Sequence, residues 1–373
     1  MKKVAIVGAG ISGLVLSSFL KKKGNFQISI FEKDNIFLNN LNGIQISPNA
    51  IRILNKINFN FFNLKKKYSV KGISFYDCEN KKKIGVMKFD YLEKNMYVTL
   101  NRNDLINFLI NQFSLKDNLI QKEVKSVKNN SIFLDGEKRL DFDLVIVSDG
   151  IFSKLRSQHS SIIYSGYSAH RGSYVSNDQK KYIDLWMGKN FHLVKYPIDN
   201  MKNNSFTLIK KERAPDVISN YNYEIKNFYS QFNKILPSDT HEIFNSQKVK
   251  IWPIYKLNDI IYGINNICYI GDSAHGFIPS RAQGAAQAIE DAFVSYNLIV
   301  KNKMYADELH KIRKKRIKKI IKKSENNLIL FHQNIFLLRS LRNLCIKLLC
   351  SSKFLIKIIN SYIFDYDYEK TLK

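Results

Sequence analysis

The chain has few cysteines and no long apolar run. Its four cysteines, Cys78, Cys268, Cys345 and Cys350, are scattered along 373 residues without metal-ligand spacing. Cys345 and Cys350 form a C-x4-C pair, but residues five apart on a helix point in different directions. We therefore expect four reduced thiols and no metal site. No uninterrupted apolar stretch approaches the length that crosses a bilayer, so the sequence predicts no transmembrane span.

Acidic residues are scarce relative to basic ones. The chain has 32 Asp and Glu against 59 Lys and Arg, a net charge of +27. Such a charge favours nucleic acid or an anionic membrane as partner. The lysines are spread everywhere among many Asn and Ile, however, so a compositional bias explains the charge equally well, and we expect no nucleic-acid partner. The densest segment, 311–323, is interpreted as a solvated helix face, with weak membrane-surface contact through 301–360 as the alternative.

The N-terminus, MKKVAIVGAGISGL, superficially imitates a secretory signal. Glycines at fixed spacing, and an acidic residue after the next apolar run, indicate a folded βαβ unit instead. The pattern predicts a strand over 3–7, a helix over 11–23 capped by Gly24, and a strand over 27–31 that ends at Glu32. We therefore expect a cytoplasmic protein, with peripheral association with the inner membrane as the alternative.

The first turn carries a dinucleotide-binding fingerprint, Gly8-Ala9-Gly10-Ile11-Ser12-Gly13. In such a motif the first glycine permits a tight turn, the second lets the backbone approach a pyrophosphate, and the third allows close helix–strand packing. The phosphates rest on the helix N-terminus, whose free N–H groups favour negative charge. Glu32, followed by Lys33, is positioned to accept hydrogen bonds from ribose hydroxyls. The motif alone is compatible with NAD or FAD.

Further elements follow along the chain. The pattern predicts helices over 49–56, 103–113 and 283–300, an antiparallel hairpin or meander over 121–140, and buried strands at 143–147 and 267–270. Together they predict an α/β fold in which a Rossmann-like dinucleotide-binding domain is interleaved with a mostly antiparallel β-sheet substrate domain. The expected boundaries are 1–70, 98–160 and 256–300 for the first domain, 71–97 and 161–255 for the second, and 301–373 for basic C-terminal helices.

Three downstream motifs give the fingerprint a more specific meaning. They are the segments Leu100–Leu105 (LNRNDL), Asp149–Arg156 (DGIFSKLR) and Gly271–Ala292 (GDSAHGFIPSRAQGAAQAIEDA). With the fingerprint, they resemble the single-component FAD-dependent aromatic hydroxylases, in the branch of salicylate hydroxylase and 6-hydroxynicotinate 3-monooxygenase. The resemblance covers nearly the whole chain. It implies FAD as the cofactor and NADH or NADPH as a transient reductant.

The resemblance also implies roles for individual residues. Arg102 would approach the flavin dinucleotide, Asp272 would bind ribityl or ribose hydroxyls, and Pro279 would line the reaction face. The helix start at Gln283 would receive the O2 edge of the flavin, where a helix N-terminus stabilises the negative charge of the reduced ring. The full expected set of cofactor-binding residues is Gly8, Gly10, Ile11, Ser12, Gly13, Glu32, Lys33, Arg102, Asp149, Gly150, Arg156, Gly271, Asp272, Pro279, Gln283, Gly284, Ala285 and Ala286.

On the substrate side, the segment HLVKYP also resembles that branch. His192 and Tyr196 would face the same side of a strand, either beside the aromatic substrate or within an aromatic core. Histidine suits the deprotonation of a phenol near neutral pH. Gln45 lies on a flavin-proximal loop similar to the G-I-x-I-x-P-N-A of the branch. Arg281 departs from the usual apolar residue, and either points into the active site and favours an acidic substrate or turns to solvent.

The implied activity is that of an FAD-dependent monooxygenase that hydroxylates a phenol or aromatic acid with O2, through a flavin C4a-hydroperoxide, as a monomer or homodimer. The absence of a second glycine fingerprint and of a redox dithiol near the first argues against a two-dinucleotide reductase. A ubiquinone-pathway-type hydroxylase of a prenylated phenol at the membrane surface is the alternative. A non-catalytic flavin-binding protein is an alternative of another class.

Overall fold

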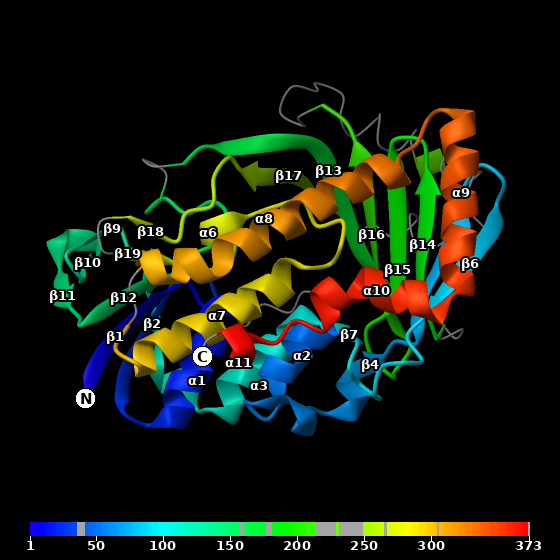
Figure 1. Ribbon diagram of the computed structural model, residues 1–373. Helices are drawn as coiled ribbons and strands as arrows, with labels where there is room; N and C mark the ends of the chain where they lie inside the picture. Colours follow the sequence, from blue (N-terminus) through cyan, green and yellow to red (C-terminus); the bar gives the residue numbers. More distant parts are fainter. Residues whose placement is uncertain are drawn as a thin grey trace.

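A computed structural model describes residues 1–35, 42–156, 160–176, 181–213, 229–230, 249–264, 267–303 and 306–371. Its first layer is a six-stranded sheet on the left of Figure 1. Val4, Ala5 and Ile6 of its central strand have no exposed surface, as expected of a parallel sheet covered on both faces. In spatial order the strands are β18 (Gly263–Ile264), β19 (Ile267–Tyr269), β12 (Leu144–Val147), β1 (Lys2–Val7), β2 (Phe26–Glu32) and β8 (Leu119–Gln121).

The second layer is a seven-stranded sheet, largely antiparallel, with one parallel pair between β14 and β5. Its central strands bury both faces, so alternate residues of one strand belong to different cores. In spatial order the strands are β17 (Lys250–Leu257), β13 (Ile162–Val175), β16 (Asn203–Lys211), β15 (Phe191–Pro197), β14 (Ile183–Gly188), β5 (Gly72–Asp77) and β6 (Lys82–Lys88).

Two small antiparallel sheets complete the β structure. One is the predicted meander, β9 (Ser126–Lys128), β10 (Ser131–Phe133) and β11 (Arg139–Asp141). The other joins β3 (Gly43–Ile46), β7 (Val98–Asn101) and β4 (Lys67–Ser69). The predicted α/β class is confirmed. Strands within 71–97 and 161–255 form the seven-stranded sheet, whereas the proposed division into domains stays a prediction.

Helices cover both sheets. α1 (Ile11–Lys23) packs on α7 (Gly284–Val300), which also contacts α2 (Pro48–Asn55) and α8 (Ala306–Phe331). Asn101 caps α3 (Arg102–Gln112), because its side chain accepts a hydrogen bond from the backbone N–H of Asn103. No helix in the described ranges is both long and apolar enough to span a bilayer.

The C-terminal helices run from one sheet to the other. In Figure 1, α8 crosses the molecule toward the seven-stranded sheet, α9 (Phe336–Ser351) stands against its edge strand β6, and α10 (Lys353–Phe364) returns toward α2. The short α11 (Tyr368–Thr371) brings the end of the described chain to α7, where the hydroxyl of Tyr368 donates to Glu290. The C-terminal segment therefore belongs to the body of the protein.

A buried ion network holds α8 on α7. Nε of Arg313 lies 2.6 Å from Oδ1 of Asp291, and its Nη1 lies 2.7 Å from Oε2 of Glu290. Arg316 adds a contact of 2.6 Å to Glu290, and the hydroxyl of Tyr368 donates to the same carboxylate. Both acidic side chains have no exposed surface. Two arginines and a tyrosine thus bind two buried carboxylates, and such pairing is the condition under which buried charge is tolerated.

Removing Arg313 should therefore destabilise the whole protein. We expect Arg313→Leu to lower the free energy of unfolding by about 3 to 5 kcal/mol, because Asp291 and Glu290 would stay buried without their main partner. Urea unfolding followed by circular dichroism measures this. The matched control is Lys311→Leu on the same helix, whose 70% exposed side chain pairs with Glu308. A loss no larger than that of the control would contradict the structural weight given to the network.

Candidate active site

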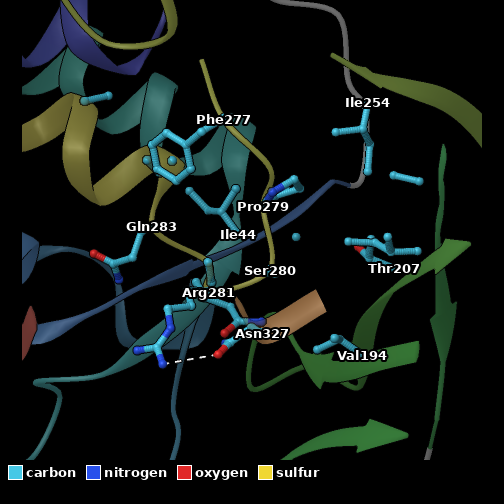
Figure 2. A pocket seen from close by; sticks show the side chains of 18 of the residues that line it. Ile44, Val194, Thr207, Ile254, Phe277, Pro279, Ser280, Arg281, Gln283 and Asn327 are labelled. Atoms are coloured by element: carbon cyan, nitrogen blue, oxygen red, sulfur yellow. Dashed lines mark hydrogen bonds between the residues drawn. The ribbon is translucent and has the colours of Figure 1, made fainter. Parts of the chain in front are cut away.

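One large cavity, of about 670 Å³, lies between the two large sheets. The loop before α7 forms one wall, and β15 and β16 of the seven-stranded sheet form the opposite wall. Figure 2 shows Phe277 and Pro279 on the loop side, with Val194 and Thr207 across from them. The C-terminal helices close the cavity with Asn327, from α8, and residues of α10.

Most of the sequence-predicted site residues line this cavity. They are Gly10, Ile11, Ser12, Gln45, Arg102, Gly150, His192, Tyr196, Asp272, Pro279, Arg281, Gln283, Gly284 and Ala285. The remaining predicted residues, which are outside the lining, are Gly8, Gly13, Glu32, Lys33, Asp149, Arg156, Gly271 and Ala286. The cavity thus gathers segments separated by more than 250 residues of sequence.

The glycines of the motifs divide into two groups. A Cβ on Gly13 would lie 2.2 Å from the carbonyl oxygen of Gly8, and one on Gly8 would lie 2.5 Å from that of Ser148, so these two glycines serve packing. A Cβ on Gly10 would come no nearer than 3.8 Å to a neighbouring atom, and one on Gly284 would meet nothing within 4 Å. Neither Gly10 nor Gly284 has a left-handed backbone. The space beside them is therefore open for a ligand that approaches the backbone.

Two helices direct uncapped N-termini at the cavity. In the described chain no side chain caps α1 at Gly10 or α7 at Gln283, and neither first turn contains an acidic residue. Free backbone N–H groups and the helix dipole favour an anionic group at each end. These ends fit the two negative regions of a flavin dinucleotide, its pyrophosphate and its reduced pyrimidine edge.

Charged groups lie between these two ends. Burial lowers the pKa of Arg102, while Asp272 and Glu32 counteract this shift. The Asp272 side chain is exposed to the cavity that it lines. Burial by the surrounding protein raises the pKa of its carboxyl. Oε2 of Glu32 accepts a hydrogen bond of 2.8 Å from the backbone N–H of Ala9, which fixes the carboxylate against the glycine loop. One guanidinium and two carboxylates together suit a ligand that carries both phosphate and hydroxyl groups.

Hydrogen bonds to Asp291 fix the loop that carries Asp272. The N–H of Gly271 donates to Oδ2 of Asp291 at 2.8 Å, and Nε2 of His275 lies 2.7 Å from the same oxygen. Burial alone would raise the pKa of Asp291, but His275 and Arg313 hold it at about 2. Gly271 itself has φ of +67°, a conformation that favours glycine. The ion network of α8 therefore reaches the loop that lines the cavity.

The structure corrects the expected position of Arg156. Its guanidinium has no exposed surface and donates to the backbone carbonyl oxygens of Ser273 and Ile151, the latter at 2.6 Å. These hydrogen bonds link the Asp149 segment to the Gly271 segment. The guanidinium is not part of the cavity lining, where a phosphate-binding group would lie. Asp149, like Arg156, is outside the cavity lining, and burial raises the pKa of its carboxyl to about 6.

His192 and Tyr196 line the cavity from β15. Nδ1 of His192 lies 2.7 Å from Nε2 of His332, which follows α8 in the chain. Burial, with a contribution from His332, lowers the pKa of His192 well below its usual value, so the ring is neutral at pH 7. Burial raises the pKa of Tyr196, and the neighbouring Arg171 counteracts this shift.

Sequence reasoning missed Arg171, His332 and Tyr97. Arg171 lines the cavity from β13, and its Nε has no hydrogen-bond partner among the described residues. Ser168, Ala169 and His170 of β13 are buried in succession, so both faces of the strand are covered there, and alternation in the sequence could not distinguish Arg171 from His170. Tyr97 donates a hydrogen bond of 2.9 Å to Oε1 of Gln45. No local signal could have paired His332 with a strand 140 residues away.

Arg281 lines the cavity and does not turn to solvent. Its Nη2 donates to Oδ1 of Asn327 at 3.2 Å, the interaction drawn as a dashed line in Figure 2. Burial lowers its pKa.

The fold and cavity define a flavoprotein, and comparison with known proteins gives its family. A family model described as "FAD binding domain" matches residues 1–303, so the chain belongs to that family. The 3-amino-4-hydroxybenzoate 2-monooxygenase of Streptomyces cremeus is 24% identical over 320 residues, 78% of this chain and 76% of the relative. Zeaxanthin epoxidase of Spinacia oleracea is 26% identical over 331 residues, and the match spans 78% of this chain but 46% of the epoxidase.

Solved structures share the fold. HpxO of Klebsiella pneumoniae, complexed with FAD and uric acid, matches with a TM-score of 0.81 at 15% identity over 97% of each chain. A salicylate hydroxylase substrate complex matches with a TM-score of 0.77 at 17% identity, over 100% of this chain and 97% of the other. The predictions of FAD as cofactor and of a monooxygenase of the aromatic-hydroxylase family are confirmed.

The open space at Gly284 can be tested directly. We expect Gly284→Val to weaken FAD binding at least about tenfold, because its side chain would occupy space that the protein leaves empty. The thermal stability of FAD-free protein should hardly change, since the added Cβ meets no neighbour. Flavin titration and melting curves measure the two effects. Gly13→Ala is the contrasting variant and should destabilise the FAD-free protein. Unchanged FAD affinity in Gly284→Val would contradict the assignment.

Proposed function

We propose that this protein hydroxylates an aromatic substrate that carries a carboxylate or a phenolate. The observation that carries the proposal is the cavity between the two large sheets, with flavin-family motifs on one wall and apolar strands bearing Arg171, His192 and Tyr196 on the other. The name of the Streptomyces cremeus relative, an aminohydroxybenzoate monooxygenase, supports an aromatic acid. NADH or NADPH supplies the two electrons and O2 supplies the inserted oxygen atom, with water as the second product.

Charge favours an anionic substrate. The described lining includes three guanidinium groups, Arg102, Arg171 and Arg281, against one carboxylate, Asp272. Arg102 and Asp272 belong to the motifs assigned to the cofactor, which leaves Arg171 and Arg281 for the substrate. A buried guanidinium binds carboxylate oxygens through charge-assisted hydrogen bonds.

We assign the FAD contacts to the cavity-lining members of the predicted set. The N–H groups after Gly10 would hold the pyrophosphate, Arg102 and Asp272 would bind phosphate and hydroxyl groups, and the start of α7 at Gly284 would receive the pyrimidine edge. Bound at these residues, reduced FAD would activate O2 for transfer of one oxygen atom to the substrate. Pro279 and Phe277 of the neighbouring loop would exclude water from the reaction face.

His192 would accept the proton of a substrate hydroxyl. A neutral imidazole is required for this step, and burial beside His332 keeps His192 neutral. Arg171, which counteracts the raised pKa of Tyr196, would stabilise the resulting phenolate in the same way. A phenolate ring is electron-rich, which favours its attack on an electrophilic oxygen. Tyr196 would orient the ring from the same strand.

The activity is tested with purified protein and FAD. Aromatic acids and phenols are screened for stimulation of NADH or NADPH oxidation, with identification of the hydroxylated product. Stimulated oxidation with one hydroxylated product per reductant supports the proposal. Flavin binding without stimulated oxidation would favour a non-catalytic flavoprotein, and activity restricted to prenylated phenols would favour the alternative substrate class. Oligomeric state and membrane contact stay separate predictions.

If Arg171 and Arg281 bind the substrate, replacing each of them should raise the KM for the substrate, by different amounts. We expect Arg171→Gln to raise the KM for an aromatic acid about ten- to hundredfold, because it removes a charged hydrogen-bond donor from a buried site. Arg281→Ala should raise it less, since Arg281 is already engaged by Asn327. Steady-state kinetics provide the values. Arg139→Gln, at a side chain 62% exposed, is the matched control. An unchanged KM in Arg171→Gln or Arg281→Ala would remove that residue from the substrate site.

Loss of the imidazole should uncouple the reaction. We expect His192→Ala to oxidise NAD(P)H in the presence of substrate but to release most of the oxygen as H2O2, because the ring would no longer be activated. The ratio of product to oxidised reductant measures coupling, and flavin content confirms that the variant is folded. Full coupling in His192→Ala would show that the histidine is only a packing residue.

A further inference from the structure

Helix α9 is inverted relative to an ordinary surface helix. Its buried positions include Arg339 and Arg342, whereas Phe336 and Leu337 are 71% and 73% exposed. Helices on a globular protein normally bury their apolar stripe and expose their charges. Here the apolar stripe faces away from the protein.

Ion pairs fix this orientation. Arg342 lies 3.4 Å from Oδ2 of the buried Asp77, and Arg339 lies 3.5 Å from Oε2 of Glu79. Asp77 is the last residue of β5, which pairs with β6 beneath α9. Close contact of Gly85 with Cys350 leaves little room to rotate the helix, since a Cβ on Gly85 would lie 2.9 Å from that of Cys350. The outward direction of the leucines is therefore built into the packing.

The exposed side chains form a large apolar set. Of the 21 large apolar side chains exposed in the described part of the chain, 13 lie between residues 329 and 359. We call the α9 and α10 members the apolar face; they are Phe336, Leu337, Leu338, Leu341, Leu344, Leu348, Phe354, Leu355, Ile358 and Ile359. In Figure 1, α9 stands at the end of the molecule formed by the seven-stranded sheet, and α10 runs from there toward α2. Large sets of exposed apolar side chains are typical of interaction sites.

The charged side chains of α9 and α10 themselves are all basic. The sequence from 326 to 364 contains no Asp or Glu. Lys347 and Lys357 are exposed on α9 and α10, and Lys353 is 76% exposed beside Asp90. An apolar stripe flanked by lysines is the pattern of helices that lie in the interface of an anionic membrane.

The apolar face also reaches the active-site cavity. Ile359 belongs to both, and Asn360, Ile363 and Phe364 of α10 line the cavity from inside. One helix therefore separates the cavity from the outer surface at this point. A surface docked here would lie beside the cavity wall.

We propose that the apolar face of α9 and α10 docks this protein on an anionic lipid bilayer. The leucines and phenylalanines enter the interfacial region of the lipid, and Lys347, Lys353 and Lys357 contact the anionic headgroups. The basic segment 311–323, first considered for such contact, is not needed for the apolar insertion. The proposal does not depend on the substrate.

A second copy of the chain fits the face less well. A symmetric dimer brings the same patch of both subunits together. It would therefore bring the three lysines of each copy toward those of the other, with no carboxylate on either helix to neutralise them. Each copy also carries a net charge of +27. Anionic lipid satisfies the apolar and cationic groups at once.

The test is vesicle co-sedimentation of the full-length, FAD-loaded protein. We expect binding to phosphatidylcholine vesicles with about a third of phosphatidylglycerol to be at least about tenfold tighter than to phosphatidylcholine alone. The combined variant Leu337→Gln, Leu344→Gln and Leu348→Gln should lower the partition coefficient about hundredfold. The reason is that three leucine side chains would no longer enter the lipid. These side chains are exposed, so folding and flavin content should be kept.

The matched control replaces exposed apolar side chains elsewhere, Val175→Gln with Met201→Gln, and should bind as the unmodified protein does. Three outcomes would overturn the proposal. The first is no binding to anionic vesicles at low salt. The second is binding that the leucine variant does not weaken, which indicates adsorption by net charge alone. The third is a dimer in sedimentation velocity that the leucine variant dissociates, without vesicle binding, which assigns the face to contact between copies.

Discussion

The buried ion network between α7 and α8 is the interaction on which the site depends. Asp291 accepts from Arg313, from His275 and from the backbone N–H of Gly271, so one carboxylate joins the C-terminal helices to the loop that carries Asp272. A carboxylate with a pKa of about 2 keeps its charge at any physiological pH, and its hydrogen bonds therefore persist. The same helix α7 directs its N-terminus at the cavity, so the anchoring and the binding geometry are set together.

The two large sheets contribute different groups to the cavity. Strand ends of the parallel sheet supply backbone N–H groups and open glycine positions such as Gly10, which suit an extended anionic cofactor. Strand faces of the antiparallel sheet supply side chains at every second position, so that His192, Val194 and Tyr196 line the cavity from one strand. Strand ends and helix N-termini thus suit the proposed cofactor contacts, whereas an apolar sheet face with a few polar groups suits the proposed aromatic ring.

Much of the site could be predicted from sequence, because its motifs couple a backbone requirement to a fixed spacing. The glycine fingerprint, Arg102 at a helix start and the Asp272 loop each lie where strand or helix ends were expected. Arg156 was placed wrongly because a guanidinium suits phosphate and backbone carbonyl groups equally well, and only packing distinguishes them. Arg171 was missed because its strand is covered on both faces, so no alternation marked the inward position.

The C-terminal helices give the clearest contrast. The sequence predicted basic amphipathic helices after residue 300, and they are present, but it could not predict that α9 would turn its arginines inward. That orientation depends on Asp77 and Glu79, more than 250 residues earlier in the chain, which attract Arg342 and Arg339 to the sheet. The sequence alone determined the α/β class, the FAD family and the nucleotide-binding motifs, because these follow from local spacing and backbone chemistry. Only the tertiary structure decided the His192–His332 pair, the guanidinium groups of the cavity and the outward apolar face, because those depend on contacts between segments far apart in the chain.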